Sequence, residues 1–210
     1  TPQELAPLNI PYVCCSYDNQ YGTLPPDSYA SVSIADEEEA CRAVTELYRC
    51  GHRRIAALVS GTEDRSISQL RYQGYVRALA AHGLPLEQEL VIEAGSFDIR
   101  QSYLAMQRRL MEGARFTALF AISDNMAIGA MRALREAGRR IPEDCSVIAI
   151  DGLTVSDYIN PTLTTLCQPM EHMGRRSVEI LLDMVEHRGG PIRETAHTTL
   201  RTGESVRDIS

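Results

Sequence analysis

The chain has 210 residues, of which 44% are hydrophobic, so it is long enough for one large core or two smaller lobes. Its formal net charge is -7, and its 21 basic residues are all arginine and form no run longer than a pair. Such a surface is a poor site for duplex DNA, because phosphate contacts need concentrated positive charge. No apolar run approaches the roughly 20 residues of a membrane span, so we expect no membrane contact.

The six cysteines lie at positions 14, 15, 41, 50, 145 and 167. They form no C-x-x-C pair, and no histidine lies at metal-ligand spacing from any of them. The first residues carry neither a basic region nor a long apolar core, so they predict no signal peptide. We therefore expect reduced thiols in a cytoplasmic protein, with neither a metal site nor a cofactor.

Short apolar strands alternate with amphipathic helices along the chain. Asp36, with Glu39 three residues later, predicts the start of the first helix, and Gly51 predicts its end. Strands are expected over 10–15, 29–34, 55–59, 90–93, 117–122, 146–150, 163–167 and 195–200. Helices are expected over about 36–51, 67–81, 99–112, 125–137 and 171–187. This alternation predicts an α/β fold of parallel sheets with helices on both faces.

Two lobes are expected from the order of these elements. The strand at 10–15 and the helix at 171–187 lie outside one continuous strand–helix block. We assign residues 1–35 and 165–195 to a first lobe, and residues 36–164 with the tail 196–210 to a second lobe.

Four of the apolar runs end directly in polar residues or glycine, as in Ser60-Gly61, Gly95-Ser96, Ser123-Asp124 and Asp151-Gly152. Ligands of parallel sheets bind just past the carboxyl ends of the strands. The residues there are small, hydroxylic or acidic, and the strand ends lack G-x-G-x-x-G, G-x-S-x-G and any Cys–His arrangement. This pattern predicts a receptor for a small polar molecule and not an enzyme.

Several ordered motifs resemble the effector-binding core of the LacI/GalR family of bacterial transcription regulators. They are GHRRIA (51–56), LRYQGYVRAL (70–79), FAISDNMAIGAMRALREAG (120–138), IPEDCSVIAIDG (141–152) and PTLTTLCQP (161–169). The resemblance implies a periplasmic-binding-protein-like fold of two lobes around a cleft, of which the first lobe is incomplete here. It also implies a homodimer and a helix-turn-helix head, absent from this chain, that binds operator DNA.

The resemblance places effector contacts at Arg71, Asp124 and Ser123. The guanidinium of Arg71 offers forked donors to hydroxyls or a carboxylate; the alternative is a surface arginine in an ion pair. Asp124 could instead cap the helix that begins near Asn125. Ser123 replaces the asparagine of the family, which keeps a hydrogen-bonding group but shortens its reach.

Further candidates follow other strands. Asp151 could accept two sugar hydroxyls, or could serve only as a turn residue before Gly152, where the family often has a second aspartate. Phe97 could stack on a sugar face or belong to the core. Three others carry weaker arguments: Gln168, which could instead bond the hinge backbone; Ser16, where several members carry aspartate; and Arg65, which could contact an acidic or phosphorylated ligand or could simply pair with Glu63 or Asp64.

We therefore expect the effector-sensing and dimerisation domain of a LacI-type regulator, with a sugar as the most frequent effector class of the family. The alternative is the substrate-binding protein of a sugar transporter, which would use the same fold. A helix-turn-helix upstream of this chain would favour the regulator, and a signal peptide would favour the transporter protein.

Overall fold

The computed structural model describes residues 10–16, 29–62 and 67–210, and the chain divides into two compact units. Unit 1 comprises residues 1–35 and 168–198, and unit 2 comprises residues 36–167 and 199–210. The chain passes between the units after Ala35, Cys167 and Thr198. The two later passages lie three residues further along the chain than the sequence predicts.

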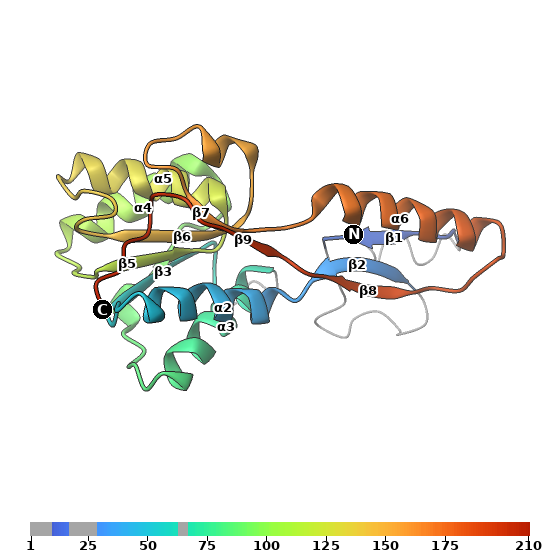
Figure 1. The fold of residues 1–210 in the computed structure, drawn as a ribbon, viewed down its shortest axis with the longest axis horizontal. Coiled ribbons are helices and arrows are strands. Elements are labelled where there is room, and N and C mark those ends of the chain that lie inside the picture. The colour runs from blue at the N-terminus through green and yellow to red at the C-terminus, as the bar shows by residue number, and fades with distance from the viewer. Residues whose placement is uncertain (1–9, 17–28, 63–66) are drawn as a thin grey trace. The chain divides into compact units, whose positions relative to one another are not determined.

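Unit 1 has a three-stranded parallel sheet in the order β1-β2-β8, on which one long helix packs (Figure 1). The strands are β1 (Val13–Cys15), β2 (Ala30–Ile34) and β8 (Arg193–Ala196), and the helix is α6 (Met170–Val185). Val32 of β2 and Met173 and Ile180 of α6 are buried in its core.

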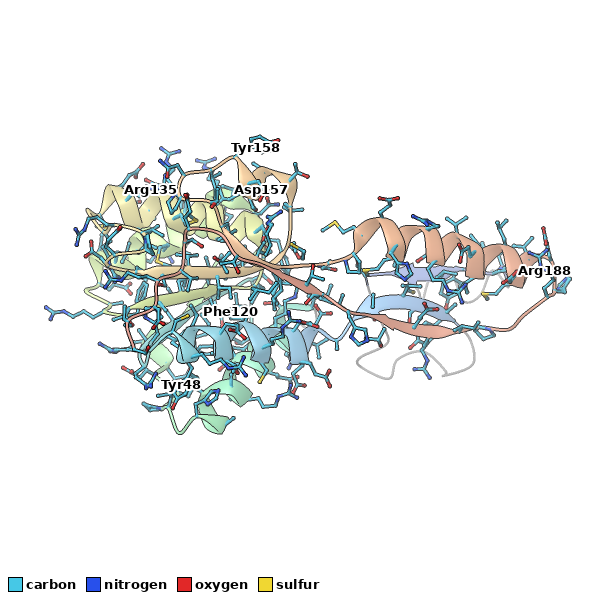
Figure 2. The ribbon with its side chains drawn as sticks, viewed as in Figure 1. Tyr48, Phe120, Arg135, Asp157, Tyr158 and Arg188 are labelled. Carbon is cyan, nitrogen blue, oxygen red and sulfur yellow. The ribbon has the colours of Figure 1, made fainter. Side chains whose placement is uncertain are left out.

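Unit 2 has a six-stranded sheet in the order β4-β3-β5-β6-β7-β9. The strands are β3 (Ile55–Val59), β4 (Val91–Glu93), β5 (Ala118–Ala121), β6 (Ser146–Asp151), β7 (Thr164–Cys167) and β9 (Thr199–Arg201). Every pairing is parallel except that of β7 with β9. All residues of β3 and β5 are buried, as expected for strands covered on both faces, and Phe120 of β5 lies inside this core (Figure 2).

Helices cover both faces of the unit 2 sheet. Figure 1 shows α2 (Asp36–Arg49) and α3 (Ile67–Ala81) on one side, and α4 (Ile99–Met111) and α5 (Asp124–Glu136) on the other. Each pair meets at a glycine that permits close backbone approach. A Cβ on Gly74 would lie 2.2 Å from the Glu37 carbonyl oxygen, and a Cβ on Gly129 would lie 2.2 Å from that of Ile99. Short 3₁₀ helices, η2 (Gln88–Leu90) and η3 (Thr154–Asp157), occupy two of the connections.

These features confirm the predicted α/β class, with mostly parallel sheets and helices on both faces. The expectation of one final strand over 195–200 is wrong. The segment forms two strands in different sheets, because β8 pairs with β2 in unit 1 and β9 pairs with β7 in unit 2. His197 and Thr198 separate the two strands at the passage between units.

Over the described part of the chain, none of the helices has the length and apolar character that crossing a bilayer requires.

Candidate functional site

The carboxyl ends of the parallel strands of unit 2 bring the predicted polar residues to one edge of its sheet. Ser123 and Asp124 follow β5, and Asp151 is the last residue of β6. Strands β3, β5, β6 and β7 run in the same direction, so their carboxyl ends share this edge. The edge is where an α/β sheet places its ligand site.

Arg71 of α3 joins three parts of this edge. Its Nε donates to Oδ1 of Asp36 at 2.8 Å, and its Nη1 donates to Oδ1 of Asp151 at 3.2 Å. The same Nη1 also donates to the carbonyl oxygen of Ile122, just after β5. Arg71 is therefore the buried centre of a carboxylate–guanidinium–carboxylate cluster, not a surface residue.

Arg71, Asp36 and Asp151 differ in how far solvent, and therefore a ligand, can reach their side chains. The side chains of Arg71 and Asp36 are 3% and 2% exposed, whereas that of Asp151 is 19% exposed. Burial by itself would lower the pKa of Arg71, but Asp36 and Asp151 together raise it above its ordinary value. Burial raises the pKa of Asp36, against the opposing effect of Arg71. Asp151 is thus the member of the cluster that solvent reaches most easily.

The backbone at Asp151 is unusual. Its φ of 144° lies in a region that L residues rarely adopt, and Gly152 follows with φ of 79°. A Cβ on Gly152 would lie 2.6 Å from Cα, Cβ and Sγ of Cys167 on the neighbouring strand β7. The second aspartate of the family therefore has no room here. Such backbone strain persists where the surrounding structure imposes it, and it is concentrated at functional sites.

Asp124 and Ser123 have separate roles at the start of α5. Ser123 is the cap of the helix, since its hydroxyl oxygen accepts from the Met126 amide at 3.3 Å. Asp124 is fully buried, and its carboxylate accepts from the Leu153 amide and the Ser156 hydroxyl at 2.7 Å each. The hydroxyl of Thr165 donates to its other oxygen at 2.6 Å. Burial raises the pKa of Asp124 against these three hydrogen bonds.

The remaining predicted residues lie elsewhere. Phe97 lies between β4 and α4 and is 38% exposed, so it is not part of the core. Ser16 and Gln168 belong to unit 1: Ser16 is exposed with φ of 58°, and Gln168 is half-buried. Arg65 lies outside the described residues. The structure thus brings together Arg71, Asp151, Ser123 and Asp124 at one edge, and the effector contacts of all eight residues stay predictions.

Sequence reasoning missed Asp36 as a member of this cluster. It assigned Asp36 only to the start of a helix, because acidic residues there are common. The missed pairing spans 35 residues and depends on the packing of α2 against α3. No local pattern in the sequence carries that information.

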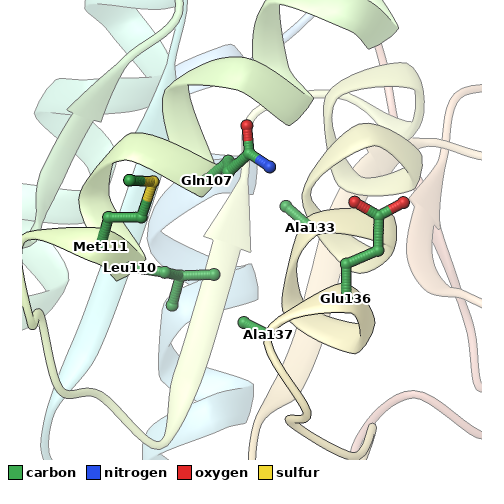
Figure 3. Close-up of a pocket in the computed structure, with 6 residues that line it drawn as sticks. All are labelled: Gln107, Leu110, Met111, Ala133, Glu136 and Ala137. Atoms are coloured by element: carbon green, nitrogen blue, oxygen red, sulfur yellow. The ribbon is translucent and has the colours of Figure 1, made fainter.

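A hollow of about 240 Å³ lies between the C-terminal parts of α4 and α5. Figure 3 shows Leu110 of α4 facing Ala133 and Ala137 of α5 across it. Gln107, Met111 and Glu136 complete the lining, so the hollow offers few polar groups to a polar ligand. It contains none of the predicted effector contacts.

Across residues 10–16, 29–62 and 67–210, no three histidine, cysteine, aspartate or glutamate side chains are grouped so that they could hold a metal ion.

Comparisons with known proteins place the chain in a family. Residues 44–206 match the family described as the periplasmic binding protein-like domain. The chain is 35% identical over 207 residues to the HTH-type transcriptional regulator CelR of Thermobifida fusca, with 99% of this chain and 58% of the relative covered. It is 35% identical over 145 residues to the ribose operon repressor of Haemophilus influenzae, with 69% and 43% covered.

A solved structure described as a transcriptional regulator CelR–cellobiose complex has the same fold. It superposes with a TM-score of 0.87 at 34% identity, covering 97% of this chain and 61% of that chain. The present chain spans about half of the length of the curated relatives it matches. The chain therefore belongs to the periplasmic binding protein-like domain family, in the branch formed by the effector-binding cores of LacI-type transcriptional regulators.

Proposed function

We propose that this chain binds a sugar as the effector of a transcriptional regulator, with Arg71 and Asp151 as its principal contacts in unit 2. Sugar hydroxyls both donate and accept hydrogen bonds. The carboxylate of Asp151 would accept from them, and the guanidinium of Arg71 would donate to them. The observation that carries the proposal is the Arg71–Asp151 pair at the carboxyl edge of the sheet, where Asp151 adopts a strained backbone. The name of the CelR–cellobiose structure supports a sugar as the ligand class.

The other predicted residues have different parts in the proposal. Ser123 and Phe97 would add contacts in unit 2, whereas Gln168, Ser16 and Arg65 stay predicted effector contacts. Asp124 would act indirectly, because both of its oxygens are already engaged within unit 2.

The regulator would be cytoplasmic and would act without catalysis. An effector changes an equilibrium between two arrangements only as far as it prefers one of them. The preferred arrangement would alter operator binding by a helix-turn-helix head, which is coupling between two distinct sites. The named relatives are regulators of this kind, whereas a transporter's binding protein would share only the fold.

A panel of neutral sugars tests the proposal directly. The melting temperature of the protein would be followed with glucose, ribose, galactose and cellobiose, since a ligand of the folded state raises apparent stability. We expect at least one sugar to raise it in a saturable manner, and Asp151→Ala to abolish that effect. If no sugar shifts the melting temperature, or if Asp151→Ala responds like the unchanged protein, this proposal is wrong.

We also propose a homodimer in which α4 of unit 2 contributes to the contact between copies. Ile99 and Leu104 of α4 are exposed beside charged groups of both signs, Asp98, Arg100 and Arg132, around a hollow of about 550 Å³. A surface with apolar groups and both charges can be complementary to itself about a two-fold axis. Analytical ultracentrifugation of Leu104→Glu should show a shift from dimer to monomer.

A further inference from the structure

Arg71 does not present an unopposed positive charge. Two carboxylates are bonded to it, one from the first residue of α2 and one from the end of β6. Asp36 lies on the buried side of this cluster, and Asp151 on the side that solvent reaches. Burial, together with the charge of Asp151, raises the pKa of a third carboxylate, that of Asp124. At this edge of the sheet one guanidinium is therefore bonded to two carboxylates, and a third carboxylate lies at the start of α5.

We propose that Asp36 is a specificity-determining residue: it neutralises Arg71 from the buried side, so that the site accepts neutral or cationic polyhydroxyl effectors and excludes anionic ones. The excluded class comprises sugar phosphates and sugar acids. This inference rests on the proposed function, because it names the chemical class of effector for the same site.

The physical argument compares what each ligand class would meet. A neutral sugar would keep the Arg71–Asp36 bond intact and donate hydroxyls to the carboxylate of Asp151, whose side chain is 19% exposed. An anion would have to displace Asp151 from Arg71 and would then lie near the carboxylates of Asp36 and Asp151. Like charges at such separations oppose each other strongly in a partly buried site. An arginine without Asp36 would be an ordinary anion-binding group, since its planar fork suits phosphate and carboxylate.

A purely structural role for Asp36, as a link between α2 and α3, predicts something different. Loss of the carboxylate would then lower stability without changing which ligands bind. The experiment must therefore measure ligand charge selectivity and not stability alone.

Inorganic phosphate is the probe, because it reports access to Arg71 without requiring knowledge of the effector. Phosphate binding would be measured by isothermal titration calorimetry on the full chain and on Asp36→Asn, Asp151→Asn and the double variant. We expect phosphate binding to the unchanged protein to be too weak to saturate in the titration, and the double variant to bind phosphate at least about tenfold more tightly than that limit. Each single variant should lie between them. Adding Arg71→Gln to the double variant should remove the gained binding.

Glu37→Gln is the matched control. Glu37 follows Asp36 directly, but its carboxylate pairs with Arg77 at the surface at 2.8 Å. The substitution removes the same charge one residue away and should leave phosphate binding unchanged. Circular dichroism of each variant establishes that it is folded. If Asp36→Asn does not fold, Asp151→Asn must still gain phosphate affinity of at least about threefold.

The inference is overturned if the unchanged protein binds phosphate through Arg71, or if the folded variants gain no affinity. Glucose, glucosamine and glucose 6-phosphate, titrated into the unchanged protein, separate this inference from the proposed function. If neutral sugars bind but the variants gain no phosphate affinity, the inference fails while the proposed function stands. If the variants gain phosphate affinity but no sugar binds, the proposed function fails while the charge exclusion stands. Binding of glucose 6-phosphate at least as tight as that of glucose also contradicts the inference.

Discussion

The hydroxyl of Thr165 donates to Oδ1 of Asp124 at 2.6 Å and so joins the start of α5 to strand β7. The other oxygen of Asp124 accepts from Leu153 and Ser156, in and beside η3. One buried carboxylate therefore fixes the segment that begins directly after Asp151 and Gly152. Its effect on an effector would be through the position of Asp151.

Replacing Asp124 tests this role. In Asp124→Ala, one partly buried amide and two buried hydroxyls lose their acceptor, so we expect a loss of about 3 kcal/mol in the free energy of unfolding. Asp124→Asn should cost less, because the amide oxygen still accepts. Urea unfolding followed by circular dichroism measures both. Asp157→Ala is the control, since Asp157 forms a partly exposed pair with Arg201 and its loss should cost under about 1 kcal/mol. Equal losses in Asp124→Ala and Asp157→Ala would contradict the assigned role.

Replacing Asp151 should weaken sugar binding with little loss of stability. The side chain is partly exposed and forms the longer of the two ion pairs of Arg71, so Asp151→Asn should leave the fold intact. We expect sugar affinity to fall at least about tenfold, because a charged acceptor becomes a neutral one. Isothermal titration calorimetry with the sugar found in the panel measures the change. Asp157→Asn, also acidic and near this segment in sequence, should keep the affinity of the unchanged protein.

The sequence predicted most of the fold because its strands are continuous apolar runs. The five residues Ile55–Val59 and the four residues Ala118–Ala121 are buried throughout, and such runs between amphipathic helices have few other interpretations. The prediction of the last strand is wrong for a different reason. Periodicity identifies extended segments but carries no information on which sheet a segment joins, so the sequence predicts one strand where the structure has β8 and β9.

The candidate site was predictable only in part. The positions of Ser123, Asp124 and Asp151 followed from strand ends, which are local features. The sequence does not predict the hydrogen-bond partners of Arg71 and Asp124. These partners are Asp36 for Arg71 and Ser156 and Thr165 for Asp124, and they lie 32 to 41 residues away along the chain, so only tertiary packing brings them to the site. The alternative that Asp124 caps the helix does not hold, because Ser123 is the cap; both side-chain types can cap a helix, so the sequence does not distinguish them.

Alanine substitutions at two helical glycines test the close packing of α4 against α5, with Gly129 of α5 as the test and Gly174 of α6 as the control. A Cβ on Gly129 would lie 2.2 Å from the Ile99 carbonyl oxygen, whereas a Cβ on Gly174 of α6 meets nothing within 4 Å. Gly129→Ala should therefore destabilise the protein by about 1–3 kcal/mol through forced separation of the helices. Gly174→Ala should stabilise it by about 0.5–1 kcal/mol through helix propensity. Thermal unfolding measures both, and a stabilising Gly129→Ala would contradict the close approach.

His52 gives unit 2 a stability that depends on pH. The residue is 2% exposed, and its ring has Nδ1 3.0 Å from the Thr117 hydroxyl and Nε2 2.9 Å from the Ser146 hydroxyl. Nε2 also lies 3.3 Å from the carbonyl oxygen of Arg207, in the C-terminal segment. Burial lowers the pKa of His52 below 6.5, its ordinary value. The folded state therefore keeps the ring neutral at pH values where the unfolded chain binds a proton.

The sign of the effect follows from this difference in proton binding. Above about pH 6.5 the ring is neutral in both states, and the stability is fully present. As the pH falls below that value, the unfolded chain takes up a proton that the folded protein excludes, so the free energy of unfolding decreases. Hydrogen exchange of the β6 amides at pH 7.5, 6.5 and 5.5 should show this decrease within unit 2. His52→Gln should flatten it, whatever its stability at pH 7.5, because glutamine does not titrate. His172→Gln, on the exposed surface of α6, should keep the slope of the unchanged protein, and an equal slope in His52→Gln would show that other groups cause the pH dependence.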